Sequence, residues 1–307
     1  YETTPTIADP SVSISAPSNS GAATGPITYT ITYTDVTQVN LSESTVTVNK
    51  TGDADATVTV TDGDTTTPTV TLSSITGDGT LGISIGSNTA RNSTKLAGAA
   101  GPSSTFTVDN TQPTVAITSS LAGNVFNQSS FTATFTFSEA VTNFEEADVT
   151  AVNATVSGFS AISSTEYNAT ITPENEGAVT IDVSAGVAQD AIGNSNLGAS
   201  QFQADYDVTT PTVSITSDIT GASTNSAFVA TFTFSEDITG FTVGDISTAN
   251  ATLSNFAATT ASVYTATVTP LSEGAVTLDV ASGIAQDNAT NNNVAATQFT
   301  TAFDTND

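Results

Sequence analysis

The sequence contains no cysteine, histidine, methionine or tryptophan, and only three basic residues among 307. Without cysteine the chain can form neither a disulfide nor a thiolate metal site, and without histidine it has neither a Ser–His nor a Cys–His catalytic pair. Carboxylate pairs stand at Glu145/Glu146 and Glu174/Glu176, and two carboxylates are enough for glycoside hydrolysis. Both pairs fall in predicted turns, and no tryptophan is present to form a platform for a sugar ring. We therefore expect no enzymatic activity.

Basic residues are so scarce that the 30 acidic residues leave a net charge of −27. Nucleic acids and anionic membranes are bound through Lys and Arg, so we expect neither as a partner. The charge attracts cations instead, although solubility or adaptation to a salty medium explains it equally well. No run of about 18 apolar residues is present, and we expect no membrane insertion in this segment. Residue 1 is Tyr and no signal peptide remains, so we expect a piece of a longer protein or a processed product.

Internal repetition is the main positive feature. Residues 131–139 (FTATFTFSE) match residues 228–236 (FVATFTFSE) at a shift of 97, and the same shift relates Pro173 to Pro270. The segment Asp-x-Thr-x-Pro-Thr-Val occurs at 109–115 and at 207–213, with a degenerate copy at 2–7. A repeated unit overrides a domain count based on length alone. We predict three domains, over residues 1–109, 110–207 and 208–307.

Within each repeat the apolar residues alternate with period two, which predicts strands with one dry face. Phe131, Ala133, Phe135 and Phe137 share one face, and threonines occupy the other. No window has a helical period. The predicted strands of the second domain lie near 113–118, 131–138, 148–153, 155–161, 165–172, 177–184 and 202–207. Seven short strands in about 100 residues indicate a two-sheet sandwich, and the first domain fits the same plan through 27–33, 45–48, 58–60, 70–72 and 81–85.

The strand ending in Phe-Thr-Phe-Ser-Glu, the step at 240–246 (GFTVGDI) and the loop at 188–194 (AQDAIGN) resemble the bacterial Ig-like repeats of giant biofilm-associated and other surface adhesins. The first domain looks like a sister repeat, so the resemblance covers essentially the whole chain. It implies an all-β tandem array of three seven-stranded Ig-like β-sandwich domains, located extracellularly at a bacterial cell surface or secreted. Only about four residues separate neighbouring domains, and proline fixes φ in each linker, so we expect an elongated rod.

Acidic and amide side chains gather at one end of each predicted sandwich, where its chain enters from the preceding domain. In an Ig-like sandwich this end holds the end of the second strand, the start of the third and the penultimate loop. Carboxylate and amide oxygens from several loops are ligands that calcium prefers, and the resemblance implies calcium between domains as well. Turn formation explains any single Asp or Asn equally well. The predicted ligands are Asp109, Glu139, Asp148, Asp190 and Asn194 in the second domain, and Asp207, Glu236, Asp245, Asp287 and Asn291 in the third.

The first domain departs from this pattern. Its second strand ends in Asp35, but its penultimate loop has Asn92 where an aspartate is expected, flanked by Arg91 and Lys95. We expect this site to be weakened, or the two basic side chains to replace the metal.

The sequence leaves three functions open. The first is a calcium-stiffened stalk or fibre section of an adhesin, whose partners are the neighbouring repeats and, in a filament or matrix, other copies joined by strand addition. The second is a module that binds an unidentified surface glycan or protein directly, with the first domain as the candidate because it alone carries basic residues. The third is a set of spacer domains in a secreted hydrolase.

Overall fold

The computed structural model of the chain describes residues 7–21 and 25–305, which form an all-β protein with three short 3-10 turns. The predicted alternation determines which side chains are buried. In β12 (Phe131–Phe137), the three phenylalanines and Ala133 are buried, while the threonines between them are exposed or half-buried. Successive side chains of a strand point to opposite faces, so this pattern gives one face to the core and the other to water.

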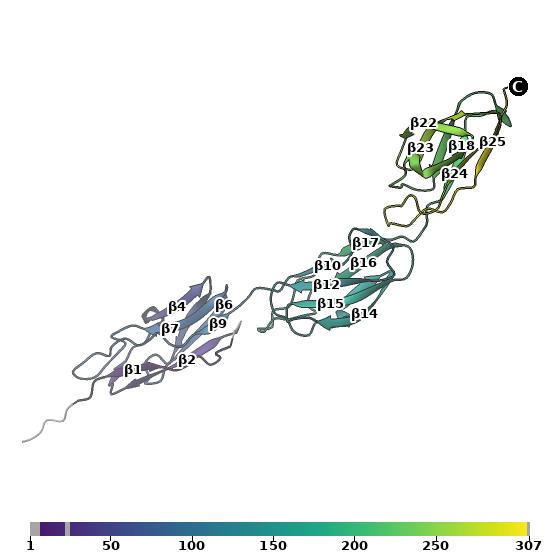
Figure 1. Cartoon of the computed structure of the whole chain (residues 1–307). Coiled ribbons are helices and arrows are strands. Elements are labelled where there is room, and N and C mark those ends of the chain that lie inside the picture. The colour runs from purple at the N-terminus through teal and green to yellow at the C-terminus, as the bar shows by residue number, and fades with distance from the viewer. Residues whose placement is uncertain (1–6, 22–24, 306–307) are drawn as a thin grey trace, which may run out of the picture. The chain divides into compact units, whose positions relative to one another are not determined.

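The strands fall into three consecutive groups, β1–β9, β10–β17 and β18–β25, called here the first, second and third repeats. Within residues 7–21 and 25–305, no sheet combines strands of two groups. The second repeat has sheets in the order β10-β12-β15-β14 and β11-β17-β16-β13, with neighbouring strands side by side (Figure 1). The Phe131 and Phe202 rings, one from each sheet, meet with centroids 6.0 Å apart. Besides β12, the strands are β10 (Val115–Ser119), β11 (Val125–Phe126), β13 (Val149–Val152), β14 (Ala154–Ala161), β15 (Glu166–Pro173), β16 (Gly177–Val183) and β17 (Phe202–Tyr206).

The third repeat reproduces this plan, with sheets β18-β20-β23-β22 and β19-β25-β24-β21. Its core lies between the sheets, because alternate residues of β20 and β24 belong to one buried cluster. The strands are β18 (Val213–Ser217), β19 (Ser223–Thr224), β20 (Phe228–Phe234), β21 (Ile246–Ala249), β22 (Ala251–Ala258), β23 (Val263–Pro270), β24 (Gly274–Val280) and β25 (Phe299–Phe303).

The first repeat has three sheets, in the orders β1-β2-β6-β5, β4-β7-β9 and β3-β8, around one buried cluster that includes Tyr29 and Leu81. Its strands are β1 (Ser11–Ile14), β2 (Ile27–Thr34), β3 (Gln38–Val39), β4 (Val46–Gly52), β5 (Asp55–Thr61), β6 (Thr69–Thr76), β7 (Gly79–Ile85), β8 (Ala90–Arg91) and β9 (Phe106–Val108).

One strand of the second repeat was not predicted. The two residues of β11 pair in parallel with β17, through Val125 opposite Asp205 and Phe126 opposite Tyr206. Two residues are too few to show an alternating pattern, so the sequence carried no signal for this strand. In the third repeat β19 pairs with β25 in the same way.

The degenerate linker copy predicted at 2–7 falls almost entirely outside the described residues. Among the residues described, the counterpart of the linker proline is Pro10. Pro10 is buried two residues before Val12, which pairs with Tyr33 of β2. Pro211 is likewise buried two residues before Val213, which pairs with Phe234 of β20.

Two compact units can be recognised from the proximity of Cα atoms. The first contains the described residues up to Val115 together with Phe137–Phe144 and Ser184–Gly198, and the second contains the other described segments. Each cluster of acidic side chains described below lies wholly within one unit.

Candidate metal site

The linker aspartate forms a tight local turn. Asp109 accepts a hydrogen bond on Oδ1 from the amide of Thr111 (3.0 Å), and Asp207 does the same with Thr209 (2.9 Å). Asp and Asn side chains commonly bond to the backbone two residues further on, which explains the fixed Asp-x-Thr spacing. Each turn presents the second carboxylate oxygen of its aspartate for other interactions.

The loop after β16 is organised around Asp190, which is only 5% exposed. Its Oδ1 accepts hydrogen bonds from the amides of Ile192, Gly193 and Asn194, at 2.8, 2.7 and 2.9 Å. Burial alone would raise the pKa of Asp190, but these bonds and one from the Asn194 side chain lower it overall. The sequence therefore folds this loop around an ionised carboxylate.

The pairing of β10 with β12 positions Glu139. The Ser138 amide donates to the Thr114 carbonyl (2.9 Å), and the Thr114 amide donates to Ser138 Oγ (3.0 Å). Ser235 and Thr212 repeat both bonds in the third repeat, at 2.9 Å each. The glutamate that follows each serine is thereby held next to the incoming linker.

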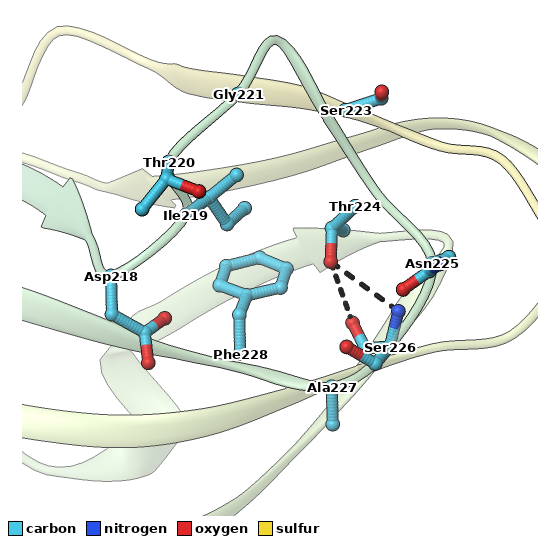
Figure 2. A pocket seen from close by; sticks show the side chains of 10 residues that line it. All are labelled: Asp218, Ile219, Thr220, Gly221, Ser223, Thr224, Asn225, Ser226, Ala227 and Phe228. Carbon is cyan, nitrogen blue, oxygen red and sulfur yellow. Dashed lines mark hydrogen bonds between the residues drawn. The ribbon is translucent and has the colours of Figure 1, made fainter. Parts of the chain in front are cut away.

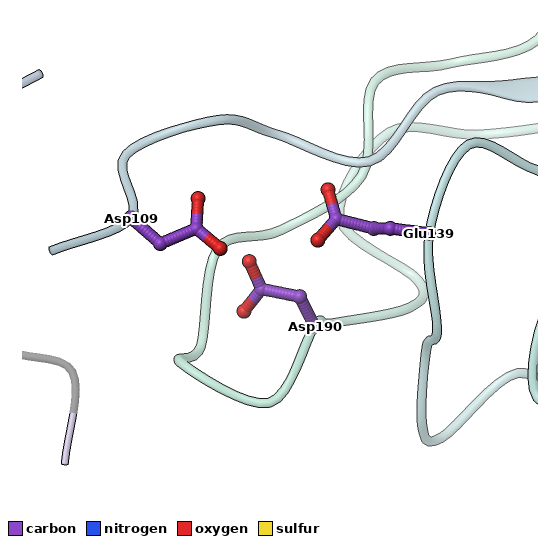
Figure 3. A group of neighbouring side chains, drawn as sticks. All are labelled: Asp109, Glu139 and Asp190. Atoms are coloured by element: carbon purple, nitrogen blue, oxygen red, sulfur yellow. The ribbon is translucent and has the colours of Figure 1, made fainter. Parts of the chain in front are cut away.

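These three elements bring three carboxylates together. One oxygen each of Asp109, Glu139 and Asp190 lies within 4.8 Å of the others (Figure 3), and Asp207, Glu236 and Asp287 form the same arrangement. The sequence predicted all six residues. In each group the aspartate of the loop is buried and the other two residues are half-buried.

Crowding changes the acidity of the glutamates. Partial burial is the largest cause of a raised pKa for Glu139, and the negative charges of Asp109, Asp190 and Asp78 add to it. Burial again comes first in raising the pKa of Glu236, followed by the charges of Asp287, Asp207 and Glu176. Like charges this close favour either protonation or a bound cation.

Asn194 and Asn291 face the carboxylates with their amide nitrogen. Asn194 Nδ2 donates to Asp190 Oδ2 (2.8 Å) and to the Asp109 carbonyl (3.0 Å). Asn291 Nδ2 donates to Asp287 Oδ2 and to the Asp207 carbonyl, both at 2.9 Å. In this arrangement the two asparagines tie the linker to the loop, and the side-chain atom that they turn toward the carboxylates is a donor.

Asp148 and Asp245, also predicted as ligands, belong to neither group of three. Asp148 Oδ2 accepts the amide of Glu145 (2.8 Å), and Asp245 Oδ2 accepts the amide of Thr242 (2.7 Å). Each aspartate closes the capping box of a 3-10 turn, η2 (Glu146–Asp148) or η3 (Val243–Asp245). Their placement corresponds to the turn-forming alternative.

Two acids that the sequence did not predict as metal ligands hold the linker from its other side. Asp78, in the turn before β7, accepts the Asn110 amide (2.6 Å) and the Thr111 hydroxyl (2.5 Å). Glu176, in the turn before β16, accepts the Thr209 hydroxyl (2.8 Å) and the amide after Asp207 (3.1 Å). Because both acids lie far from the linker in sequence, only the recurrence of an acid before the glycine of a turn could have pointed to them.

The first repeat has a different set of side chains at this end. Asn92 forms the same turn as Asp190, with its Oδ1 accepting the amides of Thr94 and Lys95, both at 2.9 Å. Its Nδ2 donates to the Ala8 carbonyl (2.9 Å), and the Lys95 ammonium bonds to the Asp9 carboxylate. Among the described residues no group of three carboxylates forms here.

Comparison with known proteins gave one family. A family model described as a bacterial Ig-like domain matches residues 109–205 and again 207–303, together more than half of the chain. The match confirms the resemblance that the sequence predicted. No curated protein matches the chain.

Several solved structures are similar at low identity. Invasin, a bacterial integrin-binding protein, is 12% identical with a TM-score of 0.37, over 95% of this chain and 60% of that one. InvD of Yersinia pseudotuberculosis is 13% identical with a TM-score of 0.35, over 96% and 98%. The I9–I11 tandem of titin is 12% identical with a TM-score of 0.27, over 95% and 98%. TM-scores this low carry no argument about function.

None of the helical turns in the described part of the chain has the length and apolar character needed to cross a membrane.

Proposed function

Because the chain belongs to the bacterial Ig-like domain family, we propose that it is a stalk section of a bacterial surface adhesin, located outside the cell, and that calcium stiffens its linkers. Its work is mechanical: it carries a binding part away from the cell surface. The partners of each repeat are the neighbouring repeats, and the chain itself catalyses no reaction.

The proposal rests on one observation. The same three-carboxylate group forms twice, and each group joins a linker aspartate to two loops of the repeat that follows. The donors are all hard oxygen atoms, and the chain has no histidine or cysteine that would favour a softer metal. Calcium takes six to eight oxygen ligands and readily accepts water among them, so three carboxylates with carbonyl groups and water are a suitable set.

The hydrogen bonds around the linker explain how a cation would stiffen it. Asp78 and Glu176 already hold the linker from the side of the preceding repeat. Three carboxylates on the other side repel one another until a cation neutralises them. A bound calcium would therefore complete the attachment of the linker to the following repeat. Asn194 and Asn291 support this attachment through the linker carbonyls.

Calcium titration of the whole chain tests the proposal. Isothermal calorimetry should give two sites per chain, and Glu139→Gln should remove one of them. Asp182→Asn is the matched control, since it removes an equal charge from a carboxylate that accepts a hydrogen bond from the Gln201 side chain (2.8 Å), next to the start of the adjacent strand β17. Small-angle scattering should give a larger maximum dimension with calcium than with chelator. Failure to bind calcium at millimolar concentration, or an unchanged stoichiometry in Glu139→Gln, would refute the proposal.

A further inference from the structure

The first repeat has a hollow between the 3-10 turn η1 (Glu43–Thr45) and the loop that joins β5 to β6. Its volume is about 460 Å³, and its lining consists of Leu41, Ser42, Glu43, Ser44, Val60 and Gly63. The amide of Leu41 donates to the Gly63 carbonyl (2.9 Å). A Cβ atom at Gly63 would lie 2.3 Å from the Leu41 carbonyl oxygen, so only glycine allows this approach. The two walls of the hollow are therefore tied together.

In the third repeat, aromatic side chains fill the corresponding place. Phe241 stands two residues before η3, as Leu41 stands two residues before η1. Its ring contacts the rings of Phe256 and Tyr264, with centroids 5.7 and 5.1 Å apart. Phe256 also stacks on Tyr264, with centroids 5.8 Å apart. The second repeat has aromatic residues at the same three positions, Phe144, Phe159 and Tyr167.

Strand pairing identifies the residues that replace these rings in the first repeat. Phe256 lies in a β-bulge of β22, opposite the residue of β23 that pairs with the third residue of β20. Val60 of β5 is its counterpart, because it lies opposite the residue of β6 that pairs with the third residue of β2. Pro68 is the counterpart of Tyr264, because each stands two residues before that paired residue. Leucine, valine and proline thus leave open the space that three rings fill in the third repeat.

Another hollow, of about 350 Å³, lies in the third repeat, where the loop from Asp218 to Phe228 encloses it (Figure 2). Its aromatic side chain is in place, because Phe228, the counterpart of Phe131, is only 4% exposed. Much of the remaining lining is polar, and Thr224 Oγ1 donates to the Ser226 carbonyl (3.0 Å) within the loop. This hollow therefore differs in kind from the one in the first repeat.

The rim of the hollow in the first repeat is acidic. Glu43 belongs to its lining, Asp62 and Asp64 stand in the adjoining loop, and all three residues are exposed. Lys50 is the one basic residue between positions 41 and 64, and its ammonium pairs with Asp55 at 3.1 Å. An apolar floor beside negative charge suits a ligand that carries an apolar group next to a positive charge.

We propose that this hollow binds an aromatic side chain of a partner protein, in a segment where Phe or Tyr stands next to Lys or Arg. The ring would rest on Leu41 and Val60, in the place that Phe256 takes in the third repeat. The basic side chain would lie against Glu43. Aromatic side chains that fill a pocket inside a polar rim contribute strongly to protein–protein affinity. The binding is independent of the proposed calcium sites, because none of the lining residues belongs to them.

Amide NMR spectra of the whole chain, recorded in chelator, test this with synthetic tripeptides blocked at both ends. Lys-Phe-Lys should shift the amides of residues 41–44 and 60–63, with a dissociation constant of about 1–10 mM, as expected for so small a ligand. Lys-Leu-Lys should bind at least about threefold more weakly, because it lacks the ring. Glu-Phe-Glu should not bind, because its charges repel the rim. Methyl glucoside is the alternative ligand, and it should cause no shifts.

Val60→Phe places a ring in the hollow and should abolish the shifts caused by Lys-Phe-Lys. Thr59→Phe is the matched control, because it adds the same ring to the exposed face of β5 and should leave binding unchanged. Glu43→Gln should weaken binding at least about threefold through the loss of a charge pair, whereas Asp182→Asn in the second repeat should not.

The proposal is overturned if Lys-Phe-Lys shifts none of these amides at about 10 mM, if Lys-Leu-Lys binds equally well, or if Val60→Phe still binds. Shifts with methyl glucoside alone would mean that the hollow takes a sugar, which also overturns it. The amide spectrum of each variant outside residues 41–63 verifies that its fold is intact.

Discussion

Asp190 has two roles that substitution can separate. Its Oδ1 organises the loop by accepting three amides, and its charge belongs to the group formed with Asp109 and Glu139. Asp190→Ala removes both roles. The amides of Ile192, Gly193 and Asn194 then lose their acceptor, and water replaces it only in part because the site is 95% buried. Each unsatisfied buried group costs about 1–3 kcal/mol, and less where water enters, so we expect the free energy of unfolding to fall by about 2–4 kcal/mol.

Asp190→Asn should remove the charge and keep the three backbone hydrogen bonds. The amide oxygen can still accept the three backbone bonds, as Asn92 shows in the first repeat, where its Oδ1 accepts two amides at 2.9 Å. The new Nδ2 group meets Nδ2 of Asn194, so one hydrogen bond is lost, at a cost of about 1 kcal/mol. Calcium affinity should nevertheless fall by at least about tenfold, because the site loses one of its three charges.

The assay is urea unfolding of both variants in chelator, combined with amide hydrogen exchange at residues 192–194. Asp190→Ala should unfold at lower urea and exchange faster at all three amides, whereas Asp190→Asn should stay close to the unaltered chain. Calcium titration then reports the charge separately. Equal destabilisation by the two substitutions in chelator would refute the assignment of separate roles, and so would a loss below about 0.5 kcal/mol for Asp190→Ala.

Three further predictions concern the linker, the core and pH. Thr209→Val should lower the free energy of unfolding by about 0.5–1 kcal/mol and speed amide exchange in the linker, because Glu176 loses a hydroxyl donor at 2.8 Å. Thr209→Ser should change neither quantity. Equal effects of the two substitutions would contradict this prediction. Phe232→Ala, at a side chain that is 0% exposed, should lower the free energy of unfolding measured with urea by about 3–5 kcal/mol. A decrease below about 1 kcal/mol would show that Phe232 does not belong to the core. In chelator, the raised pKa values of Glu139 and Glu236 mean that the folded chain holds these protons more tightly than the unfolded chain. Lowering the pH from neutral toward 4.5, the ordinary pKa of glutamate, should therefore raise the melting temperature in chelator. Bound calcium should abolish this rise. A melting temperature that does not change with pH in chelator would contradict the prediction.

The sequence alone predicted every strand of the second repeat except β11, and it predicted the three acids of each group. Alternation with period two is a local property, because a strand turns successive side chains to opposite faces whatever it pairs with. The positions of Glu139 and Asp190 follow from the order of strands in an Ig-like sandwich, which places the end of the second strand and the penultimate loop at the same end. Each of these positions can be counted along the chain.

The tertiary structure decided what each polar group faces. Asp148 caps a 3-10 turn, the Asn194 nitrogen faces Asp190, and Asp78 holds the linker from the preceding repeat. Carboxylate and amide groups form turns, caps and metal sites equally well, so residue type does not distinguish these roles. Hydrogen bonds act over about 3 Å between atoms that can be dozens of residues apart in sequence. Only folding brings such atoms together, and it determines which donor meets which acceptor around the linkers.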